Sequence, residues 1–168
     1  EIFINQPIEA AVASFGKGFS ISPLKLAQLH ASLANGGYEV TPHITYKFKT
    51  EFSNSKKRLF SNKVTKIILD WMETVVNEGS GAGAKIDGYR IGGKTGTSQK
   101  AINGIYTKEK ACSFVAMLPI DSPKYLVLVV IDAPSKSLAY GSTVAVPVVK
   151  EIIESLIVLE KIPPSIKE

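Results

Sequence analysis

The stretch GYRIGGKTGT, residues 88–97, decides the fold, because it satisfies two patterns that require different surroundings. Read from Gly88, it fits G-x-x-x-x-G-K-[ST], a loop that cradles phosphate between the end of a buried strand and the start of a helix. Read from Lys94, it is Lys-Thr-Gly-Thr, a pattern that other enzymes carry on a strand lining a site. The residues on either side distinguish between these two interpretations.

The flanking residues disfavour a phosphate loop. A glycine-rich segment, Gly79–Asp87, precedes Gly88, where the loop requires a strand of β-branched residues. After Lys94 the chain contains more glycines and no apolar period of 3.6, so no helix is expected there. One feature favours nucleotide hydrolysis, because the apolar run Tyr125–Asp132 ends in an aspartate, as a magnesium-binding strand does. A nucleotide hydrolase that uses Gly88–Thr95 therefore stays as an alternative function.

The composition indicates one globular domain. The chain has 168 residues, 45% hydrophobic and 21% charged, which is enough to bury a core. The net charge of +5 comes from scattered lysines, and the densest basic run, Lys56–Arg58, has no interleaved aromatic residues, so no nucleic-acid partner is expected. Cys112 lies in an apolar stretch and is expected to be buried. No signal peptide is evident, and the longest apolar run, Tyr125–Ile131, is too short to cross a bilayer.

Hydrophobic periodicity predicts helices and strands in a mixed order. A helix is expected from Ser22-Pro23 to Asn35–Gly37, and a second from about Asn62 to Gly79. The apolar stripe of the second helix is expected in the core: Val64, Ile67, Ile68, Trp71, Met72, Val75 and Val76. Three strands are expected at Tyr89–Ser98, Ala111–Leu118 and Tyr125–Ile131, and a last helix at about Thr143–Leu159. The fold class is therefore α+β, an antiparallel β-sheet covered by helices.

Several segments, in the same order along the chain, resemble the C-terminal half of a class B penicillin-binding protein transpeptidase domain of the septal, cell-division type. They are Ser14–Gln28, Leu33–Gly37, Val75–Gly83 with its Glu-Gly-Ser-Gly, Gly93–Gln99, Val129–Pro134 and Tyr140–Pro147. The resemblance implies a partial serine β-lactamase/D,D-peptidase-like transpeptidase fold. We expect residues 1–168 to be a C-terminal fragment of one domain, helical at about 1–80, with the sheet and final helix at about 88–160. A serine β-lactamase or a penicillin-sensing domain is the alternative within this fold.

The resemblance also implies roles for the Lys-Thr-Gly-Thr strand in acyl transfer from D-Ala-D-Ala stem peptides. Lys94 is expected to supply positive charge and a hydrogen bond to the serine of an S-x-N motif. Thr95 and Thr97 are expected to orient the substrate, with Thr97 engaging its terminal carboxylate. The backbone N–H of Thr97 is expected to be one of two oxyanion-hole donors. Gly96 is expected to leave room for the substrate backbone. Lys94 and Thr97 are thus the expected catalytic residues, and all four are expected to bind substrate.

The other motifs of this family are expected to lie outside the chain. Ser22-Pro23-Leu24-Lys25 fits S-x-x-K, but it falls within a helix that should follow the nucleophile, and no S-x-N tripeptide occurs in the sequence. We therefore expect no nucleophile here and no transpeptidase activity from this chain alone. Neither His30 nor His43 has a second ligand residue at useful spacing, so neither a metal nor a cofactor is expected.

The resemblance implies a parent protein anchored in the bacterial inner membrane, with this domain in the periplasm and no anchor in this chain. Its expected partners are peptidoglycan stem peptides, β-lactams and cell-division proteins. Apolar surface and an unpaired strand edge, exposed when the rest of the domain is absent, predict that the fragment self-associates or rearranges its loops. A non-catalytic module that binds partner proteins is the remaining alternative.

Overall fold

The computed structural model describes residues 7–16, 18–44, 57–102, 105–135 and 138–165. Its elements in chain order are α2 (Pro7–Ser14), α3 (Pro23–Ala34), α4 (Asn62–Glu78), the 3-10 helix η2 (Ala82–Ala84), β1 (Gly92–Ile102), β2 (Ile105–Leu118), β3 (Tyr125–Asp132), the π-helical turn η3 (Gly141–Ala145) and α5 (Val146–Leu159). Within these ranges no helix is long and apolar enough to cross a bilayer.

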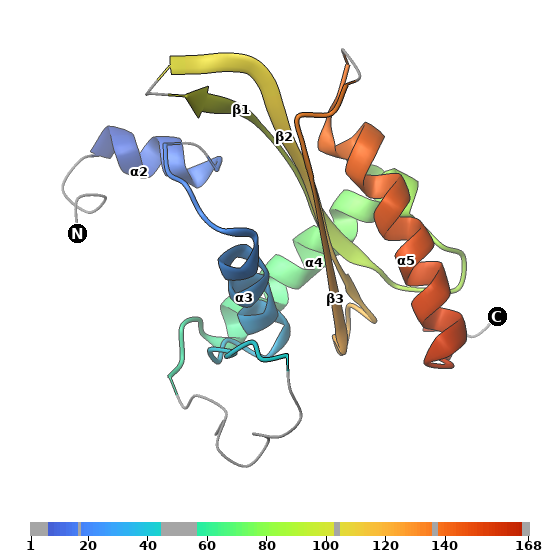
Figure 1. Cartoon of the computed structure of the whole chain (residues 1–168). Helices are drawn as coiled ribbons and strands as arrows, with labels where there is room; N and C mark the ends of the chain where they lie inside the picture. The colour runs from blue at the N-terminus through green and yellow to red at the C-terminus, as the bar shows by residue number, and fades with distance from the viewer. Residues whose placement is uncertain (1–6, 17, 45–56, 103–104, 136–137, 166–168) are drawn as a thin grey trace.

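The three strands form one antiparallel sheet in the order β1-β2-β3, with helices on both faces (Figure 1). α5 packs on one face, and α3 and α4 pack on the other. The expected α+β class is therefore confirmed. β2 is the central strand. Because both of its faces are covered, its second half, residues 111–118, is apolar at every position except Ser113.

Alternation along β2 divides the core into two parts. Phe114, Ala116 and Leu118 face α5, whereas Val115 and Met117 face α3 and α4. The larger part also contains Val76, Ala84, Ile91, Val127, Ala145, Val146, Val149, Ile153 and Ile162. The smaller part is completed by Met72 and Ile120. The sheet thus holds together helices from both ends of the chain.

The boundaries of α3, α4 and α5 lie close to those predicted from the sequence, but part of the predicted core does not. Ser22 and Ser61 cap α3 and α4 by accepting hydrogen bonds from backbone N–H groups three residues later, at 3.2 Å each. Trp71 was expected in the core but is 66% exposed, so this prediction is wrong. The apolar stripe of α4 is wider than the surface that the sheet offers, and Val64 and Ile67 are also exposed at its margin.

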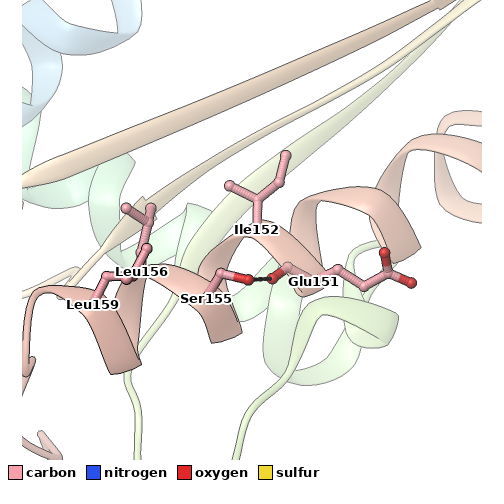
Figure 2. Close-up of a pocket in the computed structure, with 5 residues that line it drawn as sticks. All are labelled: Glu151, Ile152, Ser155, Leu156 and Leu159. Carbon is pink, nitrogen blue, oxygen red and sulfur yellow. Dashed lines mark hydrogen bonds between the residues drawn. The ribbon is translucent and has the colours of Figure 1, made fainter.

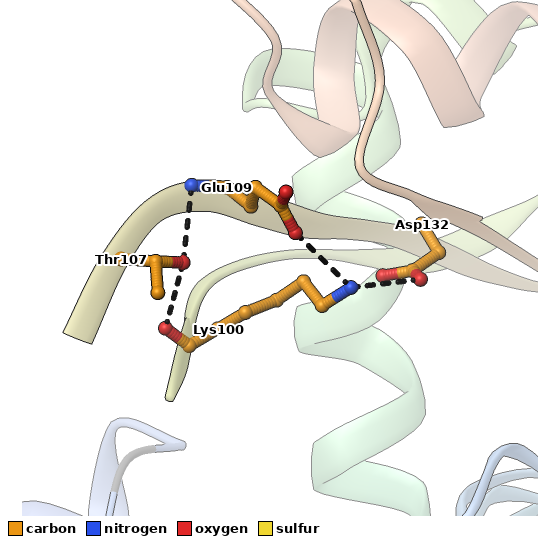
Figure 3. Close-up of polar contacts among 4 residues, drawn as sticks. All are labelled: Lys100, Thr107, Glu109 and Asp132. Atoms are coloured by element: carbon orange, nitrogen blue, oxygen red, sulfur yellow. Dashed lines mark hydrogen bonds and ion pairs between the residues drawn. The ribbon is translucent and has the colours of Figure 1, made fainter. Parts of the chain in front are cut away.

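The β1–β2 hairpin is longer than the sequence predicts and extends past the end of β3 (Figure 1). Figure 3 shows how the hairpin is held to the end of β3, at the point where it extends past that strand. The Lys100 ammonium lies 3.0 Å from a carboxylate oxygen of Asp132 and 3.4 Å from one of Glu109. These hydrogen bonds, that to Asp132 first, raise the pKa of Lys100 above its usual value. The sequence did not indicate the outer part of this hairpin, because strands that are largely exposed on both faces lack the regular apolar alternation that identifies strands. The helix α2 was not predicted either.

α4 lies very close to the start of β1. A Cβ on Gly92 would meet the Ile120 side chain and would lie 3.3 Å from the backbone nitrogen of Glu73. Arg90, just before the strand, donates to both carboxylate oxygens of Glu73 at 2.8 and 2.6 Å. This two-point hydrogen bond raises the pKa of Arg90 above its usual value, so the guanidinium stays positively charged. It fixes β1 against α4 on one side.

Gly93→Ala is expected to lower the free energy of unfolding by about 1–3 kcal/mol, because its methyl group would press on the Phe114 ring and lie 2.8 Å from the Val115 carbonyl oxygen. Urea unfolding of this chain, followed by circular dichroism, measures the change. Gly83→Ala is the matched control, since its Cβ would meet only a methyl group of Val146, at 3.0 Å. Equal losses in both variants would contradict this account.

Candidate active-site strand

The structure places the four expected site residues, Lys94 to Thr97, together in β1, at the edge of the sheet. Among the described strands, only β2 pairs with β1, so its outer edge is open. Thr95 pairs with Phe114 and Thr97 with Cys112, which puts both threonine side chains on the same face of the strand. Lys94 and Thr97 are exposed, and Thr95 is half-buried.

The local structure lacks the geometry of a phosphate loop. Lys94 lies inside a strand that continues to Ile102, where the loop requires a helix N-terminus, so the expected absence of a helix here is confirmed. Asp132, the candidate magnesium ligand of the nucleotide interpretation, accepts a hydrogen bond from Lys100. The Lys94 ammonium donates to the backbone carbonyl of its own neighbour, Thr95, at 2.9 Å.

Thr97 is held by the turn that begins the last helix. The backbone N–H of Gly141 donates to Thr97 Oγ1 at 3.0 Å. This contact needs glycine, because a Cβ on Gly141 would lie 2.5 Å from the Ser113 carbonyl oxygen and 2.6 Å from that of Gly96. Lys110 of β2 anchors the preceding residues by donating to the Ala139 carbonyl at 3.2 Å.

The Tyr140 ring strengthens this anchor. The Lys110 ammonium lies 4.4 Å from the ring centroid, within the range of a cation–π interaction. Thr143 Oγ1 accepts a hydrogen bond from the backbone N–H of Tyr140 at 3.0 Å, which shapes the start of η3. The turn that carries Gly141 is thereby fixed to the sheet.

Thr95 is held by the turn that ends α4. Its Oγ1 lies 2.7 Å from Ser80 Oγ, and either hydroxyl can donate. Gly96, between the two threonines, is also confined, since a Cβ there would lie 2.5 Å from Ser113 Oγ. Sequence reasoning assigned no role to Ser80 or Gly141, although both lie in segments that carry the family resemblance. What the sequence could not show is that Ser80 contacts Thr95 and that Gly141 contacts Thr97.

Ser22 is engaged in local structure, as expected for a helix cap. Its hydroxyl accepts from the Lys25 backbone N–H, and the Lys25 ammonium donates to Gln28 at 2.9 Å. Two further S-x-x-K matches occur in the sequence, at residues 14–17 and 53–56, and each contains residues outside the described ranges. Ser14 ends α2 and donates to the Ala11 carbonyl at 2.7 Å.

His30 points back into its own helix, where Nδ1 lies 2.9 Å from the Leu26 carbonyl, and burial lowers its pKa. Because the carbonyl oxygen only accepts, the ring donates through Nδ1. The described residues contain no group of three histidine, cysteine, aspartate or glutamate side chains able to hold a metal ion.

Three comparisons with known proteins agree on one class. Residues 3–154 match the family model for the penicillin binding protein transpeptidase domain. A peptidoglycan D,D-transpeptidase FtsI homolog from Mesostigma viride is 45% identical over 98% of this chain and 31% of its own length. Stage V sporulation protein D from Bacillus subtilis is 36% identical over 88% of this chain and 24% of its own length.

The solved TP domain of penicillin-binding protein 3 from Burkholderia pseudomallei has a TM-score of 0.81 and 31% identity, covering 96% of this chain and 49% of that chain. The fold is therefore that of about half of a penicillin-binding transpeptidase domain. The chain belongs to the penicillin-binding protein transpeptidase family, and within it to the class B, FtsI-like type. It spans about a third or less of the length of these curated relatives.

Cys112, the β2 partner of Thr97, is fully buried as expected, and burial raises the pKa of its thiol. Since the thiolate is the reactive form, we expect Ellman's reagent to react with the native chain at least about 100-fold more slowly than with the urea-unfolded chain. Absorbance at the wavelength of the released thiolate follows both reactions. A native thiol that reacts at the unfolded rate would show that β2 is not packed as described.

Proposed function

We propose that this chain forms the C-terminal part of one serine-type D,D-transpeptidase domain that cross-links peptidoglycan during cell division. The observation that supports this most is the edge strand Lys94–Thr97, whose two threonine hydroxyls lie on one face and are each held by a hydrogen bond from elsewhere in the fold. Together with the family assignment, this arrangement suits β1 as one wall of a cleft for an extended peptide with an anionic end.

The proposed roles follow from the chemistry of these groups. A serine of the complete domain attacks the carbonyl carbon of the penultimate D-alanine, the terminal D-alanine leaves with the serine's proton, and an acyl-enzyme remains. The Thr97 N–H donates to the oxygen that becomes negative in this step. Its hydroxyl, with that of Thr95, binds the terminal carboxylate. Lys94 supplies positive charge and hydrogen-bonds the S-x-N serine, and Gly96 admits the substrate backbone.

We place the nucleophile and the S-x-N motif in a part of the complete protein outside this chain. The complete protein is proposed to be membrane-anchored, with this domain on the side where peptidoglycan lies and with cell-division proteins as partners. It acts on stem peptides and is inhibited by β-lactams, which mimic their D-Ala-D-Ala ends. This chain alone is proposed to be inactive, since removing the nucleophile abolishes nearly all of the rate enhancement of such sites.

Fluorescent penicillin is expected to label the complete protein covalently and to leave this chain unlabelled, because only the complete domain contains the serine that forms the acyl-enzyme. Denaturing gel electrophoresis with fluorescence detection measures both. Ser22→Ala in the complete protein is the control and should label normally. Stable labelling of this chain that Ser22→Ala removes would overturn the proposal, and rapid loss of label from the complete protein would indicate a β-lactamase.

We further propose that this chain by itself self-associates through an apolar surface beside α5. Figure 2 shows the depression concerned, which is lined by Glu151, Ile152, Ser155, Leu156 and Leu159. Leu159 is 76% exposed, and the outer edge of β3, on which α5 packs, has no partner among the described strands. An apolar depression beside an open strand edge is a surface that another chain can cover.

Leu159→Glu is expected to weaken the self-association of this chain at least about tenfold, because a charge in an apolar contact must be desolvated. Size-exclusion chromatography with light scattering over a range of concentrations measures the effect. Val158→Glu is the matched control: Val158 is also 76% exposed but projects about 100° away around the helix. A wild-type chain that stays monomeric at high concentration would contradict the proposal.

A further inference from the structure

The turn between α4 and η2 meets β1 through one pair of hydroxyls, those of Ser80 and Thr95. Their oxygens are 2.7 Å apart, an ordinary hydroxyl–hydroxyl hydrogen-bond distance. Ser80 is exposed and Thr95 is half-buried, so the pair sits at the surface of the open edge of the sheet. The family assignment alone does not assign a functional role to Ser80.

The backbone on both sides of Ser80 is fixed. The N–H groups of Gly79 and Gly81 both donate to the Val75 carbonyl, at 3.1 and 3.0 Å. Gly81 is buried against the Phe114 ring, and a Cβ on it would lie 3.2 Å from that ring. Phe114 is also the β2 partner of Thr95. The backbone at Ser80 and at Thr95 is thus positioned by the same buried residue, Phe114, so the fold itself brings the two hydroxyls together.

The neighbouring threonine indicates the direction of this hydrogen bond. A hydroxyl has one proton to donate and two positions at which it accepts. Thr97 Oγ1 accepts from the Gly141 N–H, so the Thr97 proton is left to point at another acceptor. We propose that Ser80 is a positioning residue that donates to Thr95 in the same way and directs the Thr95 proton toward the carboxylate of a bound substrate or β-lactam.

This inference rests on the proposed function, because it assigns Ser80 to the same ligand carboxylate. In this arrangement each threonine hydroxyl accepts one hydrogen bond from the protein and donates one to the ligand. Accepting a hydrogen bond polarises a hydroxyl and makes it a stronger donor. Without Ser80, the Thr95 hydroxyl is free to rotate toward backbone carbonyls or water, and binding must then restrict it.

The test is a double-mutant cycle on acylation of the complete protein by fluorescent penicillin. Ser80→Ala is expected to lower the second-order rate constant about threefold to tenfold, as expected for one hydrogen bond. The loss should appear in the half-saturating concentration, not in the maximal rate, because it concerns ligand binding. Ser80→Thr keeps the hydroxyl and should stay within about twofold of wild type. In a Thr95→Val background, Ser80→Ala should have no further effect.

Each other outcome counts against the inference. If Ser80→Ala costs the same in both backgrounds, or if Ser80→Thr loses as much as Ser80→Ala, Ser80 has only a structural role. If wild type is acylated and Ser80→Ala is unchanged, the inference falls and the proposed function stands. If the complete wild-type protein is not acylated at all, both the proposed function and this inference are wrong. Urea unfolding of each variant of this chain separates a loss of fold from a loss of binding.

Discussion

The close approach of three backbone segments to β1 is the constraint on which the candidate site depends. α4 comes against its start at Gly92, β2 pairs along its inner edge and lies close at Gly93, and η3 reaches Gly96 through Gly141. Each approach requires a position without a side chain, and each fixes a different part of the strand. Because β1 is positioned in this way, its outer edge can stay open without losing its shape, which is the property that a cleft-lining strand needs.

Much of this fold could be predicted from the sequence, because its buried elements have strong periodicities. The α4 and α5 stripes and the apolar half of β2 correctly indicated an antiparallel sheet covered by helices. The long β1–β2 hairpin could not be predicted, since it is largely exposed near its tip and its residues there do not alternate between apolar and polar. The exposure of Trp71 could not be predicted either, because periodicity gives the direction of a side chain but not the width of the surface that covers it.

The candidate site was only partly predictable for a similar reason. Lys94–Thr97 is contiguous, so a short pattern was enough to locate it. Ser80 and Gly141 are far from it in sequence, and their contacts with Thr95 and Thr97 depend on the register of β1 with β2 and on where two turns pass. One sequence gives neither the register nor the paths of these turns. The importance of the Ser80 hydroxyl and of the glycine at position 141 is therefore evident only from the residues that they contact.

The bond from Gly141 to Thr97 has a consequence for the order in which the wall is built during synthesis. A ribosome makes Thr97 long before Gly141, and domains fold as the chain emerges, N-terminal parts first. When β1 and β2 have paired, the Ser80 contact can already form, but the Thr97 hydroxyl has no fixed orientation until the turn before α5 has emerged. The turn at Gly141 therefore fixes the Thr97 side chain only after the strands β1 and β2 have been synthesised.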